Sequence, residues 1–141
     1  MEEYLVFAQN HPLLLLVLVA VIGAIIWTEF SRFTRKYKQV NTTEAVQLLN
    51  RDDAVVLDVR QDSEVRAGKI RGARHIPVAN LKTRLSELDF AKEKPLLVYC
   101  QSGVRSAQAC DLLSKSGFTN VNNLSGGMTA WESANLPISK R

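Results

Sequence analysis

The stretch VYCQSGVRSA, residues 98–107, joins the end of an apolar run to the start of a helical segment. The run PLLVYC (95–100) has the length and the uniform apolar character of a strand that is buried on both faces of a sheet. A loop of small residues follows, and the segment 104–118 then has a helical pattern that ends near Gly117. A buried strand that leads through a short loop into a helix is typical of an α/β sheet.

The chain after residue 38 continues this alternation. We expect further strands at 54–59, 74–78 and 119–124, and further helices at 41–50, 63–68, 80–88 and 126–136. Asn41 and Glu44 have the spacing of an approximate capping box at the first of these helices. The sequence therefore predicts an α/β domain over residues 39–141, with a mainly parallel central sheet and helices on both faces. Residues 39–41 would be its linker to the preceding segment.

The first 38 residues have a different character. Leu13 to Trp27 contains no polar side chain, and as a helix it spans about 22 Å, less than a hydrocarbon core of about 30 Å. Flanking aromatic and arginine side chains can extend it through the interface. The missing polar face argues against an interfacial helix, and acidic residues before the run argue against a signal peptide. A buried core helix is the other alternative. We predict one transmembrane anchor within residues 1–38.

Charge distribution indicates how such an anchor is oriented. The formal net charge is +4, and a basic cluster follows the apolar run at Arg32, Arg35, Lys36 and Lys38. By the positive-inside rule this flank stays in the cytoplasm and the amino terminus lies outside, so the domain is expected in the cytoplasm. Charges of both signs are mixed along the rest of the chain, without a basic face lined by aromatic residues. We therefore expect no nucleic-acid partner.

The cysteines and histidines are too few and too scattered for a disulfide framework or a metal site. Cys100 and Cys110 form no CxxC motif, His11 and His75 lie far from each other, and no group of cysteines and histidines has the spacing of zinc ligands. We expect no metal and free thiols in a reducing compartment. Cys110 shares a helix face with apolar neighbours, which indicates a core thiol.

Cys100 is different because three features near it lower the pKa of a thiol. The N–H groups of Gln101, Ser102 and Gly103 can form an anion-binding nest. The following helix directs its positive end at the sulfur, and Arg105 adds a cation. These features favour a nucleophile, although an inert core thiol remains the alternative at this point.

Four stretches together resemble the rhodanese-type sulfurtransferase family. YCQSGVRS (99–106) resembles its active-site loop, and LDVR (57–60), EVRAGKIRGARHIP (64–77) and LSGGMTAW (124–131) resemble further family motifs in the expected order. Two positions depart from the pattern, since Lys69 and His75 stand where the family commonly has histidine and asparagine. The anchored arrangement is similar to small membrane-tethered rhodanese-domain proteins of bacteria, which implies the cell inner membrane.

The resemblance implies a reaction and a set of site residues. Cys100 would take a sulfane sulfur from a small anion such as thiosulfate, become a persulfide, and pass the sulfur to a thiophilic acceptor such as cyanide or a protein thiol. Arg105 would attract the donor, while Asp58 and Arg60 would support the loop, as would Ser106. The implied substrate-binding residues are Gln101, Ser102, Gly103, Val104, Arg105 and Ser106. No cofactor is implied.

Two other functions remain to be weighed. A cysteine phosphatase places arginine one residue later than Arg105 and usually has histidine where this chain has Tyr99, so the loop fits a phosphoryl group poorly. A tethered domain of the same fold could instead be a non-catalytic adaptor that binds other membrane proteins. The loop favours the enzyme because it keeps the polar features that a thiolate needs.

Overall fold

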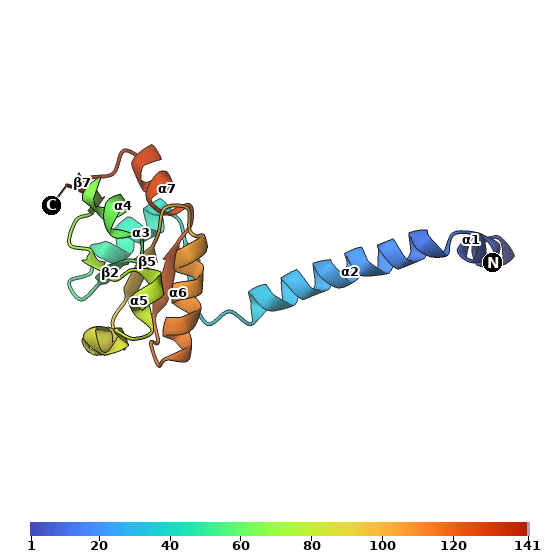
Figure 1. Ribbon diagram of the computed structural model, residues 1–141, viewed down its shortest axis with the longest axis horizontal. Coiled ribbons are helices and arrows are strands. Elements are labelled where there is room, and N and C mark those ends of the chain that lie inside the picture. Colours follow the sequence, from blue (N-terminus) through green and yellow to red (C-terminus); the bar gives the residue numbers. More distant parts are fainter. Residues whose placement is uncertain (141) are drawn as a thin grey trace. The chain divides into compact units, whose positions relative to one another are not determined.

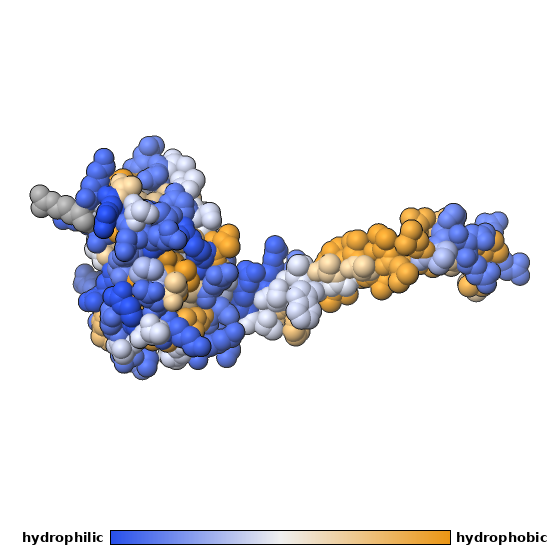
Figure 2. Space-filling model, viewed as in Figure 1, coloured by the Kyte–Doolittle hydropathy of each residue, from blue (hydrophilic) through white to orange (hydrophobic). Residues whose placement is uncertain are grey.

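The computed structural model describes residues 1–140 and divides the chain into two compact units, Met1–Arg35 and Lys36–Arg141 (Figure 1). The first unit holds the helices α1 (Glu2–Asn10) and α2 (Pro12–Phe33). Among the described residues, α2 is the one helix long and apolar enough to cross a membrane. Figure 2 shows apolar surface over much of α2, with paler and hydrophilic residues toward its C-terminal end.

The helix α2 is longer than the apolar run alone suggested. It continues past Trp27 to Phe33, and its 22 residues measure about 33 Å. Three hydroxyl side chains in or just after this extension donate back to helix carbonyls: Thr28 at 2.8 Å, Ser31 at 2.9 Å and Thr34 at 3.1 Å. These bonds satisfy the hydroxyls without water, and the same extension carries the exposed ion pair of Arg32 with Glu29. The separate helix α1 was not predicted.

The second unit is built on a parallel sheet, which confirms the predicted fold class. Its strand order is β1-β6-β5-β2-β4, and every neighbouring pair is parallel. The strands are β1 (Lys38–Val40), β2 (Val55–Asp58), β4 (Arg74–His75), β5 (Leu96–Tyr99) and β6 (Val121–Leu124). β5 is the central strand, so the loop after it leaves from the middle of the sheet.

Apolar side chains on both faces of the sheet pack against helices. In β5, Leu96 and Val98 belong to one core cluster, whereas Leu97 and Tyr99 belong to the other, as the alternation of side chains along a strand requires. The first cluster includes Leu113 from α6. The helices are α3 (Thr42–Leu49), α4 (Asp62–Arg66), α5 (Val78–Leu81), the 3-10 helix η1 (Leu85–Ala91), α6 (Val104–Lys115) and α7 (Gly127–Ser133).

The segment after the anchor is partly a strand. We expected residues 39–41 to be a linker, and this is wrong because β1 pairs with β6 along Lys38–Val40. One buried residue, Val40, is too weak a pattern to reveal an edge strand. The predicted capping box is present: Glu44 N–H donates to Asn41 Oδ1 at 2.9 Å, and Asn41 N–H to Glu44 Oε2 at 2.8 Å.

Two further details differ from the sequence prediction. The helix expected over 80–88 is divided into α5 and η1, with the Lys82–Arg84 turn between them. Two strands of two residues each, β3 (Lys69–Ile70) and β7 (Ile138–Ser139), form a small antiparallel sheet. Strands this short have no detectable alternation in the sequence.

Candidate active site

Cys100 lies directly after β5, beneath the loop that leads into α6. Its residue is 0% exposed, and Gly103 N–H donates to its sulfur at 3.1 Å. Gly103 has a φ of +98°, and a Cβ at this position would lie 3.3 Å from the Gly126 nitrogen, so the turn requires glycine. The sulfur is therefore held beneath the loop and not on the open surface.

The surroundings of Cys100 favour its thiolate. Burial opposes ionisation, but the hydrogen bonds from the Ser106 hydroxyl and from the N–H groups of Ser106, Ser102 and Gly103 outweigh it and lower the pKa of Cys100. We expected the Gln101 N–H group in this nest, and the structure instead places that of Ser106 there. The sulfur also lies at the N-terminal end of α6, whose dipole favours negative charge.

The loop residues Gln101 and Val104 do not donate hydrogen bonds to the sulfur. Gln101 faces outward from the sulfur: its Oε1 accepts from Arg60 Nη1 at 3.4 Å, and its carbonyl accepts from Thr129 N–H at 3.1 Å. Val104, the first residue of α6, is 66% exposed. Both residues therefore belong to the outer side of the loop rather than to the sulfur cradle.

Arg105 is held by a carboxylate that the sequence did not single out. Its Nη1 and Nη2 atoms donate to Glu64 Oε2 at 2.8 Å and Oε1 at 2.7 Å. Glu64 Oε2 also accepts from Gln61 N–H at 2.9 Å. The bond to Arg105 is the largest cause that lowers the pKa of Glu64 to about 2, and the same bond raises the pKa of Arg105. The loop's cation is therefore already paired.

Asp58 and Arg60 form a buried network that reaches the loop. Arg60 Nη2 donates to Asp58 Oδ2 at 2.7 Å and to the Gly68 carbonyl at 2.7 Å. The Tyr99 hydroxyl donates to the same Asp58 oxygen at 2.6 Å and accepts from Ile70 N–H at 3.0 Å. Burial is the largest influence on Arg60 and would lower its pKa, but Asp58 outweighs it and raises the pKa. The network ties β2, β5 and the loop together.

His75, one of the two departures from the family pattern, supports this network. Its Nε2 donates to the Arg60 carbonyl at 2.7 Å, and its Nδ1 lies 3.4 Å from Asp62 Oδ1. The histidine therefore fixes the backbone at Arg60. Lys69, the other departure, donates to the Ala73 carbonyl at 3.2 Å and so stabilises the turn that follows β3.

Asn123 is a second residue that the sequence analysis missed. It lies in β6, is 1% exposed, and accepts from the Ser106 hydroxyl at 2.6 Å. The same hydroxyl lies 3.4 Å from the Cys100 sulfur. The signal was available, because a buried strand rarely contains asparagine without a specific hydrogen-bonding reason.

Cys110 is a core thiol, and the described residues contain no metal-binding cluster. Cys110 is buried in the core, and burial raises the pKa of its thiol, so it stays neutral and unreactive. Within residues 1–140 no group of three or more histidine, cysteine, aspartate or glutamate side chains could hold a metal ion.

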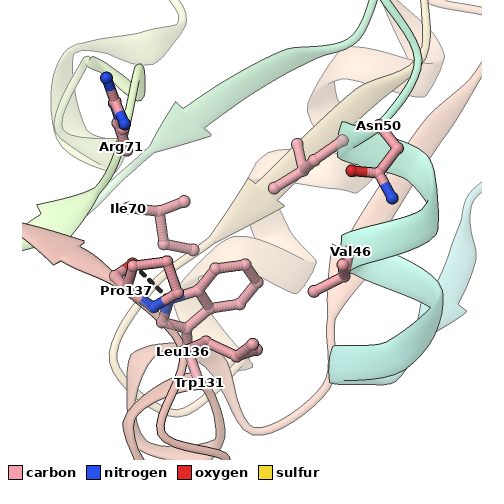
Figure 3. Close-up of a pocket in the computed structure, with 8 residues that line it drawn as sticks. Val46, Asn50, Ile70, Arg71, Trp131, Leu136 and Pro137 are labelled. Atoms are coloured by element: carbon pink, nitrogen blue, oxygen red, sulfur yellow. Dashed lines mark hydrogen bonds between the residues drawn. The ribbon is translucent and has the colours of Figure 1, made fainter.

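The apolar pocket in Figure 3 lies away from this chemistry. Trp131 and Leu136 line it together with Ile70, and its volume is about 340 Å³. The Trp131 indole donates to the Pro137 carbonyl at 3.0 Å. None of the predicted site residues lines this pocket, so the candidate active site is defined by the cysteine loop.

The chain is similar to known proteins of different lengths. The chain is 34% identical over 139 residues to the uncharacterized protein YibN of Escherichia coli strain K12, covering 98% of this chain and 97% of that protein. It is 32% identical over 98 residues to thiosulfate sulfurtransferase GlpE of Pseudoalteromonas translucida, covering 70% and 91%. The first similarity extends over the apolar N-terminal helix as well as the domain.

Solved structures show the same fold. A rhodanese-related protein from Thermoplasma volcanium superposes with a TM-score of 0.67 at 28% identity, covering 74% of this chain and 100% of that one. A Rhodopseudomonas palustris protein, described as a possible tyrosine phosphatase, gives 0.67 at 28% identity, covering 73% and 85%. The family model for the rhodanese-like domain matches residues 41–134. The chain therefore belongs to the rhodanese-like family.

Proposed function

We propose that this chain is a membrane-anchored sulfurtransferase that moves sulfane sulfur from a small anion such as thiosulfate to a thiol acceptor through a persulfide on Cys100. One observation carries the proposal: three N–H groups and one hydroxyl surround the Cys100 sulfur at the start of α6. Such a cradle stabilises negative charge on sulfur. Family membership and the relative named as a thiosulfate sulfurtransferase support it.

The proposed reaction has two steps. The Cys100 thiolate attacks the sulfane sulfur of thiosulfate, a new S–S bond forms, and sulfite leaves with the electron pair of the broken S–S bond. The acceptor thiolate then attacks the outer sulfur of the persulfide, and the Cys100 thiolate leaves. The hydrogen-bond donors of the loop stabilise the negative charge on sulfur in each step. The two steps balance without a cofactor.

Loop length favours sulfur over phosphate. Four residues, Gln101 to Val104, separate Cys100 from Arg105, one fewer than a cysteine phosphatase uses. The cradle's N–H groups converge on the sulfur itself. A phosphoryl group would need a wider loop.

We further propose that α2 crosses the cell inner membrane once, with the amino terminus outside and the domain in the cytoplasm. The length of α2 and the basic cluster from Arg32 to Lys38 support this orientation. Trypsin added to intact spheroplasts should leave the domain uncut, and should cut it after the membrane is opened. Digestion in intact spheroplasts would reverse the orientation.

Turnover tests the enzymatic proposal. The full chain in detergent micelles should form thiocyanate from thiosulfate and cyanide, Cys110→Ser should retain this activity, and Cys100→Ser should lose it. The wild-type chain should not hydrolyse p-nitrophenyl phosphate. A folded chain that forms no thiocyanate, together with a Cys100→Ser variant that still functions in cells, would favour an adaptor that binds other membrane proteins.

A further inference from the structure

The carboxamide of Asn123 has a fixed orientation. Its Nδ2 atom donates to the Gly103 carbonyl at 3.2 Å and to Gln39 Oε1 at 3.1 Å. The carbonyl of Gly103 can only accept, so the amide nitrogen must face it, and Oδ1 must face Ser106. Asn123 thus connects β1, the loop and the first turn of α6.

The Ser106 hydroxyl has two neighbours that can accept its single hydrogen. Its oxygen lies 2.6 Å from Asn123 Oδ1 and 3.4 Å from the Cys100 sulfur. When the thiol is protonated, S–H donates to Ser106 and Ser106 donates to Asn123. When the sulfur is a thiolate, the hydroxyl hydrogen can turn to it, which leaves the buried Asn123 Oδ1 without this donor.

We propose that Asn123 is a positioning residue that directs the Ser106 hydroxyl hydrogen, holding it away from a neutral Cys100 sulfur and releasing it to an anionic one. The consequence for turnover rests on the proposed function. After sulfur transfer the negative charge lies on the outer sulfur, the inner sulfur is neutral, and the hydrogen returns to Asn123. Asn123 therefore favours the persulfide over the free thiolate.

Arg105 and Cys110 also influence the Cys100 sulfur, and neither residue is mutated in the test. The Arg105 guanidinium, held by Glu64, is near enough for Cys100 to contribute to its raised pKa, and Cys100 also acts on the pKa of Cys110. Neither side chain bonds to Asn123. A change at Asn123 therefore acts on the sulfur through Ser106 or through the Gly103 backbone.

A double-mutant cycle separates these two routes. Iodoacetamide alkylation of Cys100 is followed by intact mass against pH, in the full chain in detergent micelles, for wild type, Asn123→Ala, Ser106→Ala and the double variant. Asn123→Ala frees the hydroxyl hydrogen for the thiolate. At pH values below the midpoint of the wild-type curve of alkylation rate against pH, alkylation should therefore be about three- to tenfold faster than in wild type. In the Ser106→Ala background the same change should give no such gain.

A matched control and a second variant keep the test decisive. Asn122→Ala removes the neighbouring buried asparagine, whose Nδ2 donates to the Leu96 carbonyl instead, and should leave the alkylation midpoint unchanged. Asn123→Ser is used if circular dichroism shows that Asn123→Ala does not fold. An effect of equal size with and without Ser106 would overturn the proposal, because it would assign the role to Gly103.

This readout does not depend on sulfur transfer. A chain that shows the coupling but forms no persulfide would refute the proposed function and keep the role of Asn123. A chain that forms the persulfide but shows no coupling would support the proposed function and refute the role of Asn123.

Discussion

At the scale of single residues, Arg105 and Glu64 together determine the charge that the anionic sulfur donor meets beside the loop. Both terminal nitrogens of Arg105 donate to Glu64, and with a pKa of about 2 Glu64 is anionic at neutral pH. The pair is partly exposed, so it can exchange partners with an incoming anion. Arg105 must leave Glu64 before it can bind that anion fully.

Removing the charge of Glu64 should therefore strengthen donor binding. In Glu64→Gln, Arg105 is no longer neutralised, and the KM for thiosulfate should fall about three- to tenfold in steady-state assays of thiocyanate formation. Glu87→Gln is the matched control, because Glu87 holds Arg84 through a similar pair, at 2.7 and 2.9 Å, that is not part of the loop. A higher KM in Glu64→Gln would show that Glu64 positions Arg105 instead of screening it.

The same carboxylate gives a pH dependence of stability. Folding lowers the pKa of Glu64 from 4.5 to about 2, so its stabilising contribution is complete above pH 4.5 and is lost as the pH falls toward 2. Thermal unfolding of wild type and Glu64→Gln should show a difference in Tm that shrinks over this range. A constant difference would contradict a stabilising ion pair.

The loop residues, whose role is local, could be found from the sequence alone, and the family resemblance added Asp58 and Arg60; two other residues with distant contacts were missed. Cys100, Ser102 and Gly103 lie in one contiguous loop, so their convergence follows from the turn itself. Glu64 and Asn123 reach the loop only through the sheet and α4, which no local pattern encodes. The sequence shows where these two residues stand in their own elements, but it does not show which loop residues they contact.

At the scale of elements, the start of α7 forms the back wall of the loop. Met128 N–H donates to the Cys100 carbonyl at 2.8 Å. Gly127 has a φ of +54°, and a Cβ on it would overlap the same Cys100 carbonyl oxygen. The double glycine of LSGGMTAW therefore lets α7 approach the nucleophile's backbone closely, which gives that motif a physical reason.

A side chain at Gly127 should displace the loop. Gly127→Ala should lower the free energy of unfolding by about 3 kcal/mol or more, through strain plus overlap, and slow thiocyanate formation. Gly117→Ala is the control: its φ is +94°, but nothing lies within 4 Å of the added Cβ. That variant should lose about 1–2 kcal/mol in urea unfolding and keep its activity. Equal effects of the two variants would mean that strain alone is responsible.

The edge strand β1 sets where the domain begins. It pairs with β6 on one side and carries Gln39, which accepts from Asn123. A piece that starts at Lys36 should fold, whereas one that starts at Asn41 should be less stable by about 2–4 kcal/mol because it loses these hydrogen bonds. Urea unfolding of the two pieces checks this, and equal stability would show that β1 is dispensable.

Element prediction succeeded where the apolar pattern was long. The buried strands β2 and β5 and the helix α6 were found because each shows several consecutive or periodic apolar residues. The strands β1, β3 and β7 have two or three residues and depend on partners far along the chain, so they were missed. The division of the 80–88 helix into α5 and η1 has no clear breaker in the sequence.

At the scale of the whole molecule, the chain joins an apolar helix to a rhodanese-like domain with little sequence between them. The first unit ends at Arg35 and the first strand begins at Lys38. The similarity to YibN covers 98% of this chain, so it extends over both parts.

The most direct measurement is the intact mass of the full chain after exposure to thiosulfate under non-reducing conditions. The account predicts a gain of one sulfur atom that cyanide removes, that persists in Cys110→Ser and that is absent from Cys100→Ser. A folded wild-type chain that gains no sulfur, or a gain that survives in Cys100→Ser, would contradict the persulfide on Cys100.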